Sequence, residues 1–289
     1  MEVKVAIVDA FVDGQKGGNP AGVVLNADGL TSEQKRSIAS QVGLSETAFI
    51  SQSSTADFKL DFFTPQRQIA HCGHATIASF SYLSQLDLIS QTHTSKETID
   101  GNRTIIVEDG SAYMEQSAPK YREINDEIPT VLAALSLSND DLIAQPIIAN
   151  TGNSFILVGV KDIVTLNRIA ADTAAINALS EKYDLIGFYV FALETNKPDR
   201  DASTRMFAPR YGIEEEAATG MAAGPLACYL FDYLRFEKTH FAIEQGYSML
   251  TASPSCIDVT LSLEDGSIAS LLAGGTAIVS GYRTVEVQA

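Results

Sequence analysis

The tetrapeptide HCGH at 71–74 is the densest group of residues that could do chemistry. It could bind a metal, pair a thiol nucleophile with a histidine base, or form a loop of hydrogen-bonded polar groups. A metal centre needs three or four ligands, and the remaining histidines, His93 and His240, stand alone in polar segments. We therefore predict no metal at HCGH. A cysteine before a helix, such as Cys72, is more often a small buried residue than a nucleophile.

Glu46 lies in the segment GLSETAFI, between a predicted helix that ends at Gly43 and a predicted strand over 47–51. Most glutamates in loops are simply solvated. The apolar residues on either side of Glu46 nevertheless indicate a partly buried position, and burial favours the uncharged form of a carboxyl group. Such a group can exchange protons with a substrate, which makes Glu46 a candidate general acid/base.

The run Glu214-Glu215-Glu216 directly precedes a second predicted helix, over 221–235. A run of acidic residues is usually a solvated surface, and it also interacts favourably with the positive end of the helix that follows. The functional alternative is that one of the three carboxylates turns into a cleft and faces His74.

The composition excludes several classes of function. The 289 residues include 20 Lys or Arg and 36 Asp or Glu, which gives a net charge of −16. Nucleic acids and anionic membranes are therefore not expected as partners, because phosphate binding depends on basic residues. No apolar run is long enough for a spanning helix. The N-terminus lacks a signal-peptide pattern and the three cysteines are scattered, so we expect a reducing cytoplasm.

Two segments about half the chain length apart repeat the same pattern. DFFTP at 61–65 is followed by GHATIASFSYL from Gly73, and RMFAP at 205–209 is followed by GMAAGPLACYL from Gly220. Each copy predicts a strand, a turn marked by proline, a loop, and a helix of small residues that begins at glycine. Such helices pack closely on all sides, and their free N–H groups favour an anion. We expect the two helix starts to meet and form an anion site.

The local patterns indicate an α+β protein rather than a doubly wound sheet. Thr31 begins a predicted helix with Gln34 as its capping-box partner, and Asp109-Gly110 marks a hairpin over 104–116. The polar segment 117–130 carries two prolines and is the predicted linker. No Gly-rich nucleotide-binding motif follows a strand, so no nucleotide cofactor is expected.

The motifs resemble those of the PhzF family, the phenazine-biosynthesis-like isomerases, which have the diaminopimelate epimerase fold. The matching segments cover nearly the whole chain in the family's order: DAF at 9–11, GGNPAGVVL at 17–25, LSETAF at 44–49, FFTP at 62–65, HCGHAT at 71–76, TRMFAP at 204–209, ATG at 218–220, EQG at 244–246 and AGGTAIVSG at 273–281.

The resemblance implies two similar halves, each a curved or barrel-like mixed sheet around a central helix. We place the halves at 1–118 and 119–276, and expect a strand at about 277–289 to return to the first half. The implied activity is a cofactor-independent isomerase that moves a proton between carbons of a small, carboxylate-bearing anionic metabolite. Members of the family are often homodimers.

The resemblance also implies roles for particular residues. Glu46 would be the catalytic acid/base, and His74 and Glu216 would polarise or position the substrate. The implied substrate-binding residues are Asn19, Gly73, Thr219, Gly220, Met221 and Gln245.

The sequence departs from the family pattern at two places. The family usually has EDPATGS where this chain reads EEAATGM at 215–221, so Glu216 is one methylene longer than the usual aspartate and Met221 replaces a serine. Leu250-Thr251 stands where a Gly-Arg pair usually follows EQG. We therefore expect a substrate other than the dihydro-hydroxyanthranilate of phenazine synthesis.

Two alternatives remain open. Related epimerases use two opposed cysteines, and here Cys72 occupies the first place while Thr219 occupies the second, so a two-thiol mechanism is not available. The chain could still be an amino-acid epimerase that uses Glu46 and Cys72. It could also be a non-catalytic protein that kept the fold and binds a small molecule.

Overall fold

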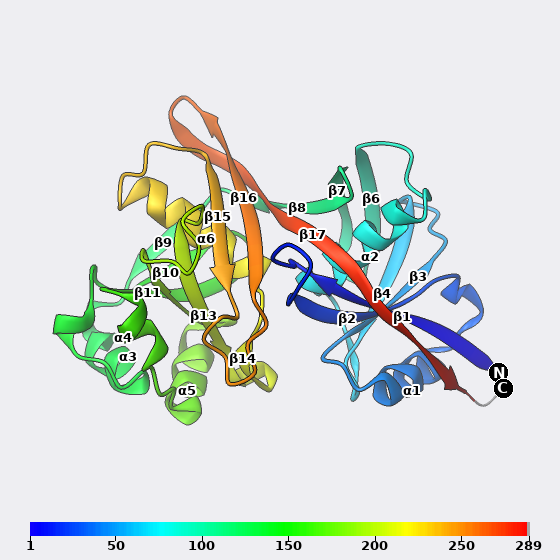
Figure 1. Ribbon diagram of the computed structural model, residues 1–289, viewed down its shortest axis with the longest axis horizontal. Helices are drawn as coiled ribbons and strands as arrows, with labels where there is room; N and C mark the ends of the chain where they lie inside the picture. Colours follow the sequence, from blue (N-terminus) through cyan, green and yellow to red (C-terminus); the bar gives the residue numbers. More distant parts are fainter. Residues whose placement is uncertain (288–289) are drawn as a thin grey trace. The chain divides into compact units, whose positions relative to one another are not determined.

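The computed structural model describes residues 1–287, and the chain divides into two compact units. The first unit comprises Met1–Glu115 together with residues 274–287, and the second comprises Gln116–Ala273. The boundaries proposed from the sequence lay three residues further along the chain at both places. The chain crosses between the units along two strands, β8 (Ser111–Ser117) and β17 (Ser267–Glu286) (Figure 1).

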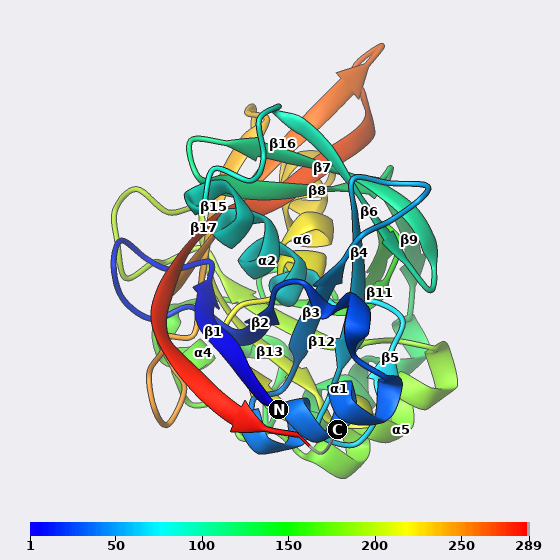
Figure 2. The same cartoon turned by 90° about the vertical axis from the view of Figure 1, so that its right-hand side faces the viewer.

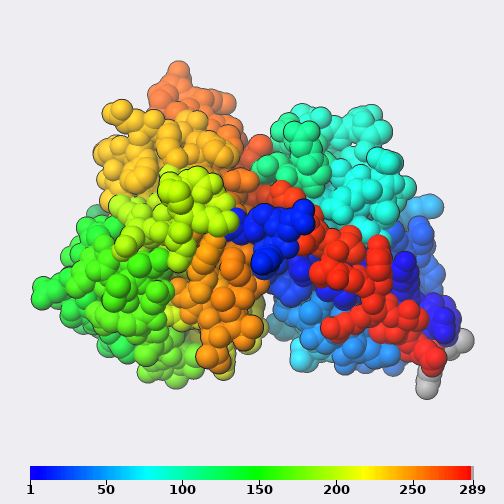
Figure 3. Space-filling view, in the orientation of Figure 1, coloured from blue at the N-terminus to red at the C-terminus, as the bar shows by residue number. Residues whose placement is uncertain are grey.

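The first unit is a strand circuit that closes on itself. Its order is β17, β1, β2, β3, β4, β6, β7, β8 and back to β17, with parallel pairs at β2–β3 and β4–β6. The N-terminal strand and the C-terminal part of β17 lie side by side on its surface (Figure 3). The bounds are β1 (Glu2–Ala10), β2 (Asn19–Val24), β3 (Thr47–Ser51), β4 (Phe58–Phe63), β5 (Gln68–Ile69), β6 (His93–Thr98) and β7 (Gly101–Glu108).

Helix α2 (Gly73–Gln85) is the central helix of the first unit. Every residue from Gly73 to Leu83 is buried, and the helix packs against β1, β2, β3 and β7. Figure 2 shows it next to β1, β2 and β3. Two of its buried hydroxyls donate within the helix, Thr76 Oγ1 to the Cys72 carbonyl at 2.6 Å and Ser79 Oγ to the Ala75 carbonyl at 2.7 Å. These two small polar side chains are thus satisfied locally, which lets strands approach from several sides.

The second unit repeats this architecture. Its strands run β9, β10, β11, β12, β13, β15, β16, with parallel pairs at β11–β12 and β13–β15. Helix α6 (Gly220–Asp232) is buried from Ala222 to Leu230 and packs against β10, β11 and β16. The bounds are β9 (Lys120–Glu123), β10 (Ile147–Asn150), β11 (Ser154–Val160), β12 (Gly187–Ala192), β13 (Ala202–Ala208), β14 (Ile213–Glu216), β15 (His240–Gln245) and β16 (Ser255–Glu264).

The predicted internal repeat is confirmed by the strand pairing. In both units a parallel pair is followed by an antiparallel, a parallel and an antiparallel pair, in the same chain order. The short strands β5 and β14 each fold back on the strand before them and then lead into the central helix. The fold class predicted from the sequence, two similar α+β halves around central helices, is therefore correct.

The outer helices contribute satellite cores. Helix α1 (Ser32–Val42) buries Ile38, Ala39 and Val42 against Phe49 and Phe63. In the second unit a cluster that includes Val131, Ile176 and Phe188 joins the outer helices to the sheet. These helices are α3 (Ile128–Ala134), α4 (Ile163–Asn167) and α5 (Thr173–Tyr183). Within residues 1–287, no helix combines the length and apolar character that crossing a membrane requires.

Local predictions succeeded where the chemistry was specific. The capping box at Thr31 and Gln34 is present, and Gly43 ends α1 in the left-handed conformation at φ 67°. Asp109 and Gly110 both have positive φ at the turn between β7 and β8.

The predicted linker at 117–130 was wrong. Residues Lys120–Glu123 form β9, which pairs with β10, and Ile128–Ala134 forms α3. The two prolines misled the prediction because each occupies a tolerated place. Pro119 precedes the strand and Pro129 lies in the first turn of a helix, where no N–H donor is needed.

Close backbone packing in the second unit predicts a sensitive glycine. A Cβ on Gly187, at the start of β12, would lie 2.1 Å from the Phe207 carbonyl oxygen, so Gly187→Ala must displace backbone. We expect it to lower the free energy of unfolding by about 3 kcal/mol. Gly281→Ala is the control, because nothing lies within 4 Å of its added Cβ. Urea denaturation checks both variants, and equal stabilities would contradict the packing described here.

Candidate active site

The start of α2 and the approach to β3 bring the candidate groups together. Cys72 is the residue before the helix and has an extended backbone, with φ −146° and ψ 121°. Gly73 and His74 follow in the first turn. Glu46 immediately precedes β3, and its carbonyl oxygen accepts a hydrogen bond from Gly22 N at 3.1 Å. The pairing of β2 with β3 therefore fixes the backbone of Glu46 against the sheet around α2.

Glu46, His74 and Cys72 form a buried array. The Nε2 atom of His74 lies 3.3 Å from Oε2 of Glu46, at ion-pair distance, and the two side chains are 5% and 11% exposed. On the other side of the ring, Nδ1 of His74 lies 3.6 Å from Sγ of Cys72. The imidazole thus stands between a carboxylate and a thiol. We call these three residues the Glu46–His74–Cys72 array.

The geometry of the array suits proton transfer better than metal binding. One potential ligand atom from each of the three residues lies within 4.8 Å of the others. The thiol and the carboxylate, however, face different nitrogens of the imidazole. An ion bound to one nitrogen would draw away from the group at the other. An imidazole with a partner at each nitrogen can instead accept a proton at one side and release it at the other.

A second buried group, the ammonium of Lys96, contacts the start of α2 through Thr76. Lys96, on β6, is completely buried, and its Nζ donates to Thr76 Oγ1 at 2.6 Å. The same Nζ lies 3.4 Å from Nδ1 of His71. Burial lowers the pKa of Lys96 to about 7, with a further decrease from Arg103, although nearby Cys72 acts in the opposite direction. Burial, together with the charges of Lys96 and Arg103, lowers the pKa of His71 to about 3.

In the second unit, Gln245 holds the turn before α6. Its Oε1 accepts from the Tyr189 hydroxyl at 3.0 Å and from Thr219 N at 3.1 Å. Its Nε2 donates to the Glu216 carbonyl at 2.7 Å and to Thr219 Oγ1 at 3.2 Å. Thr219 in turn donates to the Glu216 carboxylate. Both ends of the Gln245 amide are engaged by the protein, so it positions the turn, and the substrate-binding role that we assigned to it stays a prediction.

The acidic run at 214–216 separates into three different environments. Glu214 is exposed, whereas Glu215 forms a two-pronged ion pair with the buried Arg205, with both N···O distances at 2.8 Å. The Arg205 guanidinium also donates to two backbone carbonyls, those of Leu166 and Ile169. Arg205 therefore fixes β14 and with it the backbone of Glu216. Of the three glutamates, Glu214 is solvated, Glu215 is held by Arg205, and Glu216 accepts a hydrogen bond from Thr219 in the turn before α6.

The other predicted binding residues lie at element ends. Asn19 is buried and begins β2, and the carbonyl of Gly220 accepts from Gln116 Nε2 at 3.0 Å. Met221 is half-buried, with its sulfur 3.3 Å from Asn153 Nδ2. The departure at 250–251 falls on an exposed loop, where Leu250 is fully exposed.

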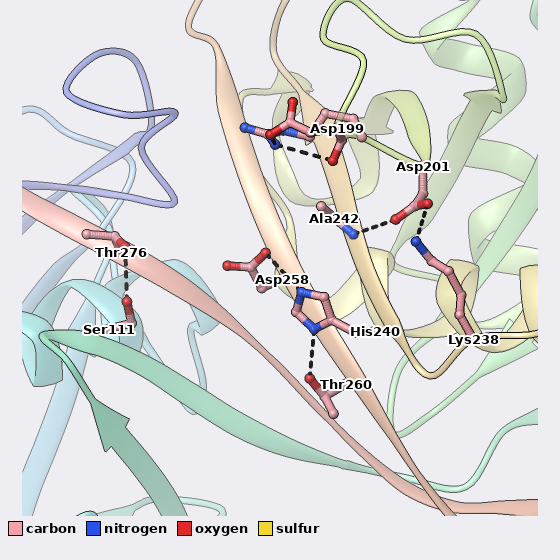
Figure 4. A network of polar contacts seen from close by, with 10 residues as sticks. Ser111, Asp199, Asp201, Lys238, His240, Ala242, Asp258, Thr260 and Thr276 are labelled. Atoms are coloured by element: carbon pink, nitrogen blue, oxygen red, sulfur yellow. Dashed lines mark hydrogen bonds and ion pairs between the residues drawn. The ribbon is translucent and has the colours of Figure 1, made fainter.

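His240 belongs to a different polar network, on the surface of the second unit (Figure 4). Its side chain is 64% exposed, with Asp258 at 4.0 Å and the Thr260 hydroxyl at 3.2 Å. Asp201, which Figure 4 also shows, binds Lys238 and the backbone N of Ala242. The contacts of Asp201 fasten the start of β13 to β15.

The structure thus brings together Glu46, His74 and Cys72 in the first unit, and Glu216, Thr219 and Gln245 in the second. The expected meeting of the two helix starts involves both units and stays a prediction, as do the catalytic roles. Sequence reasoning missed Lys96 and Arg205. The strand HTSKET carries no apolar alternation that would show its lysine facing inward, whereas the arginine of TRMFAP, inside an apolar strand, did offer a signal.

The fold and the array define a class: a duplicated strand-rich protein with a buried carboxylate and imidazole at the start of its central helix. Residues 8–281 match the family model of the phenazine biosynthesis-like proteins, PhzC-PhzF. The chain belongs to this family.

Relatives and solved structures agree with that assignment. The chain is 29% identical to the uncharacterized isomerase YddE of Escherichia coli, over 96% of this chain and 97% of the relative. It is 31% identical to the trans-2,3-dihydro-3-hydroxyanthranilate isomerase of Pseudomonas chlororaphis, over 78% of each. The crystal structure of a PhzF family protein from Bacillus anthracis superposes with a TM-score of 0.89 at 27% identity, covering 99% of this chain and 100% of that one.

The two lowered pKa values predict how stability depends on pH. Between pH 6.5 and about 3 the unfolded chain protonates His71 while the folded chain does not, so acidification lowers the free energy of unfolding. Between pH 10.5 and about 7 the unfolded chain protonates Lys96 while the folded chain does not, so lowering the pH over this range also lowers the free energy of unfolding. Each group contributes a slope that approaches about 1.4 kcal/mol per pH unit.

Urea denaturation at pH 4.5, 7 and 9.5 measures these slopes. His71→Phe should flatten the acidic part of the profile, and Lys96→Met should flatten the alkaline part, because each removes one group that titrates differently in the two states. Profiles of both variants that run parallel to the wild-type profile would contradict the burial described for these side chains.

Proposed function

We propose that this protein is a cofactor-independent isomerase that moves a proton between carbons of a small carboxylate-bearing metabolite. The observation that supports it best is the buried contact between Glu46 and His74 at the first turn of α2. A carboxylate enclosed in this way exchanges protons with a bound carbon acid more readily than one in bulk water, provided that a partner stabilises both of its states.

The proposed reaction requires one proton carrier. Glu46 takes the proton from a carbon next to an unsaturated or carbonyl carbon, the double bond shifts, and Glu46 returns the proton to another carbon. His74 holds the carboxyl group in place and stabilises its charge. Backbone N–H groups at the start of α2, including that of Gly73, bind the carboxylate of the substrate, because helix N-termini favour anions.

The names of the relatives support the reaction class. Both curated relatives described above are called isomerases. The substitutions at Glu216 and Met221 favour a substrate other than trans-2,3-dihydro-3-hydroxyanthranilate, since they change the length of one polar group and remove another.

We also propose that the protein acts in the cytoplasm. Its strongly acidic composition is compatible with a soluble enzyme, and among residues 1–287 no two cysteines form a disulfide. The homodimer implied by the resemblance is part of the same proposal, and size-exclusion chromatography with light scattering tests it.

Glu46→Gln tests the central role. The amide keeps the size of the side chain but cannot carry a proton, so it should reduce proton exchange by about 10²–10⁴-fold. The protein is incubated in D2O with a pooled library of small carboxylic acids, including trans-2,3-dihydro-3-hydroxyanthranilate. Mass spectrometry then identifies compounds that gain deuterium with the wild type and not with the variant.

Glu108→Gln is the matched control, because Glu108 is an exposed glutamate on β7 of the same unit. It should label the same compounds at the wild-type rate. If no compound gains deuterium with the wild type, or if Glu46→Gln labels as fast as the wild type, the proposed chemistry is wrong, and a binding protein on this fold becomes the better account.

An amino-acid epimerase is the second candidate, and the contact between Cys72 and His74 is the observation that favours it. Because Thr219 cannot act as an opposed thiol, we expect Cys72→Ser to keep most of the proton exchange, within about threefold of the wild-type rate. The same D2O assay measures it, with the chiral standard L-amino acids added. Loss of exchange at an amino-acid Cα in a folded Cys72→Ser protein would put the epimerase first.

A further inference from the structure

Lys96 is a buried ammonium group without a carboxylate partner. Its side chain is completely buried on β6, and among residues 1–287 no carboxylate lies at ion-pair distance from its Nζ. The Nζ instead contacts a hydroxyl, that of Thr76, and a ring nitrogen, that of His71. The face of Phe62 lies 5.2 Å away, measured to the ring centroid. Burial of a lysine without a counter-charge is costly, so the arrangement calls for an explanation.

The hydrogen bonds of Lys96 lead directly to the first turn of α2. Lys96 Nζ donates to Thr76 Oγ1 at 2.6 Å, and Thr76 Oγ1 donates to the Cys72 carbonyl at 2.6 Å. The direction of this chain is fixed, because the carbonyl can only accept and the hydroxyl has a single proton. The ammonium is therefore joined through one side chain to the residue that precedes Gly73 and His74.

The position of the charge matches the polarity of the helix. A helix N-terminus such as that of α2 carries partial positive charge, because its first N–H groups have no partner within the helix. A full positive charge behind the same turn, enclosed by the sheet and shielded from water, strengthens the attraction of that turn for an anion, because screening is weak in the interior.

We propose that Lys96 is a positioning residue of the isomerase, whose buried charge holds the HCGH turn and strengthens the binding of the substrate's anionic group at Gly73. This inference rests on the proposed function for the identity of the ligand. Lys96 acts through the Thr76 hydroxyl and the Cys72 carbonyl. It takes no part in the proton transfer itself.

The effect has a defined pH dependence. The titratable groups that act on Lys96 are His71 and Cys72 before α2, and Asp100 and Arg103 on the β6–β7 side. The neighbours from β4 and α2, Phe62 and Thr76, do not titrate. With its pKa lowered to about 7, Lys96 loses its charge as the pH rises through neutrality. Anion binding at Gly73 should weaken over the same range.

Inorganic sulfate is the probe, and the amide cross-peak of Gly73 in a ¹H–¹⁵N spectrum reports its binding. Lys96→Met keeps the length of the side chain and removes the charge. We expect it to weaken sulfate binding at least tenfold at pH 6, and to match the wild type at pH 9. Lys35→Met is the matched control, because Lys35 is a buried lysine of the same unit that pairs with Asp61 at 2.6 Å. It should bind sulfate like the wild type at both pH values.

A second measurement keeps the test decisive if Lys96→Met does not fold. In the wild type, the ¹⁵N resonance of Lys96 Nζ and the sulfate affinity at Gly73 should change with the same midpoint. Different midpoints would overturn the proposal, as would equal affinities of Lys96→Met and wild type at pH 6, or a Gly73 signal that sulfate does not move.

Sulfate binding requires no turnover, so the two proposals fail separately. Loss of sulfate binding in Lys96→Met with no deuterium labelling by the wild type would reject the isomerase and keep the anion site. Normal deuterium labelling by the wild type, with sulfate binding that does not depend on the charge of Lys96, would keep the isomerase and reject the role of Lys96.

Discussion

The contact between the Glu46 carboxylate and the His74 imidazole depends on where the central helix begins. His74 reaches Glu46 because α2 starts at Gly73, within a closed circuit of strands, and because the β2–β3 pairing brings Glu46 to the same place. Small residues in α2 allow the strands to approach, and burial then makes the contact chemically useful. A helix start one residue earlier or later would rotate His74 by about 100° and separate the pair.

The two units share one architecture, but the turns before their central helices, α2 and α6, carry different residues. In the first unit the turn before α2 carries an imidazole, a thiol and, beneath it, a buried ammonium. In the second unit the turn before α6 is fastened by Gln245, while Arg205 clamps the preceding strand through Glu215. The neighbouring Glu244 is fully buried and accepts from the backbone and side-chain nitrogens of Asn196 at 2.6 Å each. Glu244 and Gln245 of the EQG motif therefore both make structural hydrogen bonds within their own unit.

Much of the fold could be predicted because its signals are local. Thr31 and Gln34 satisfy each other across one helical turn, Gly43 supplies the positive φ that ends the helix, and the repeated strand–turn–helix pattern reveals the duplication. The prolines at 119 and 129 could not be placed from sequence, since proline is tolerated both before a strand and at the start of a helix. Lys96 was invisible because its burial results from the pairing of β6 with β4 and from the position of α2, neither of which its neighbours encode. The residue patterns already identified Glu46, with a partly buried position, and His74 as candidates, and the resemblance added their roles, but the distance between them required the folded chain.

The central claim is that Glu46 carries the substrate proton, and a crystal structure of Glu46→Gln bound to a compound identified by deuterium labelling tests it most directly. The account predicts that the labelled carbon lies about 3–3.5 Å from a side-chain atom of residue 46, with a carboxylate oxygen on the backbone N of Gly73. A labelled carbon bound out of reach of residue 46, with another acid or base beside it, would contradict the account.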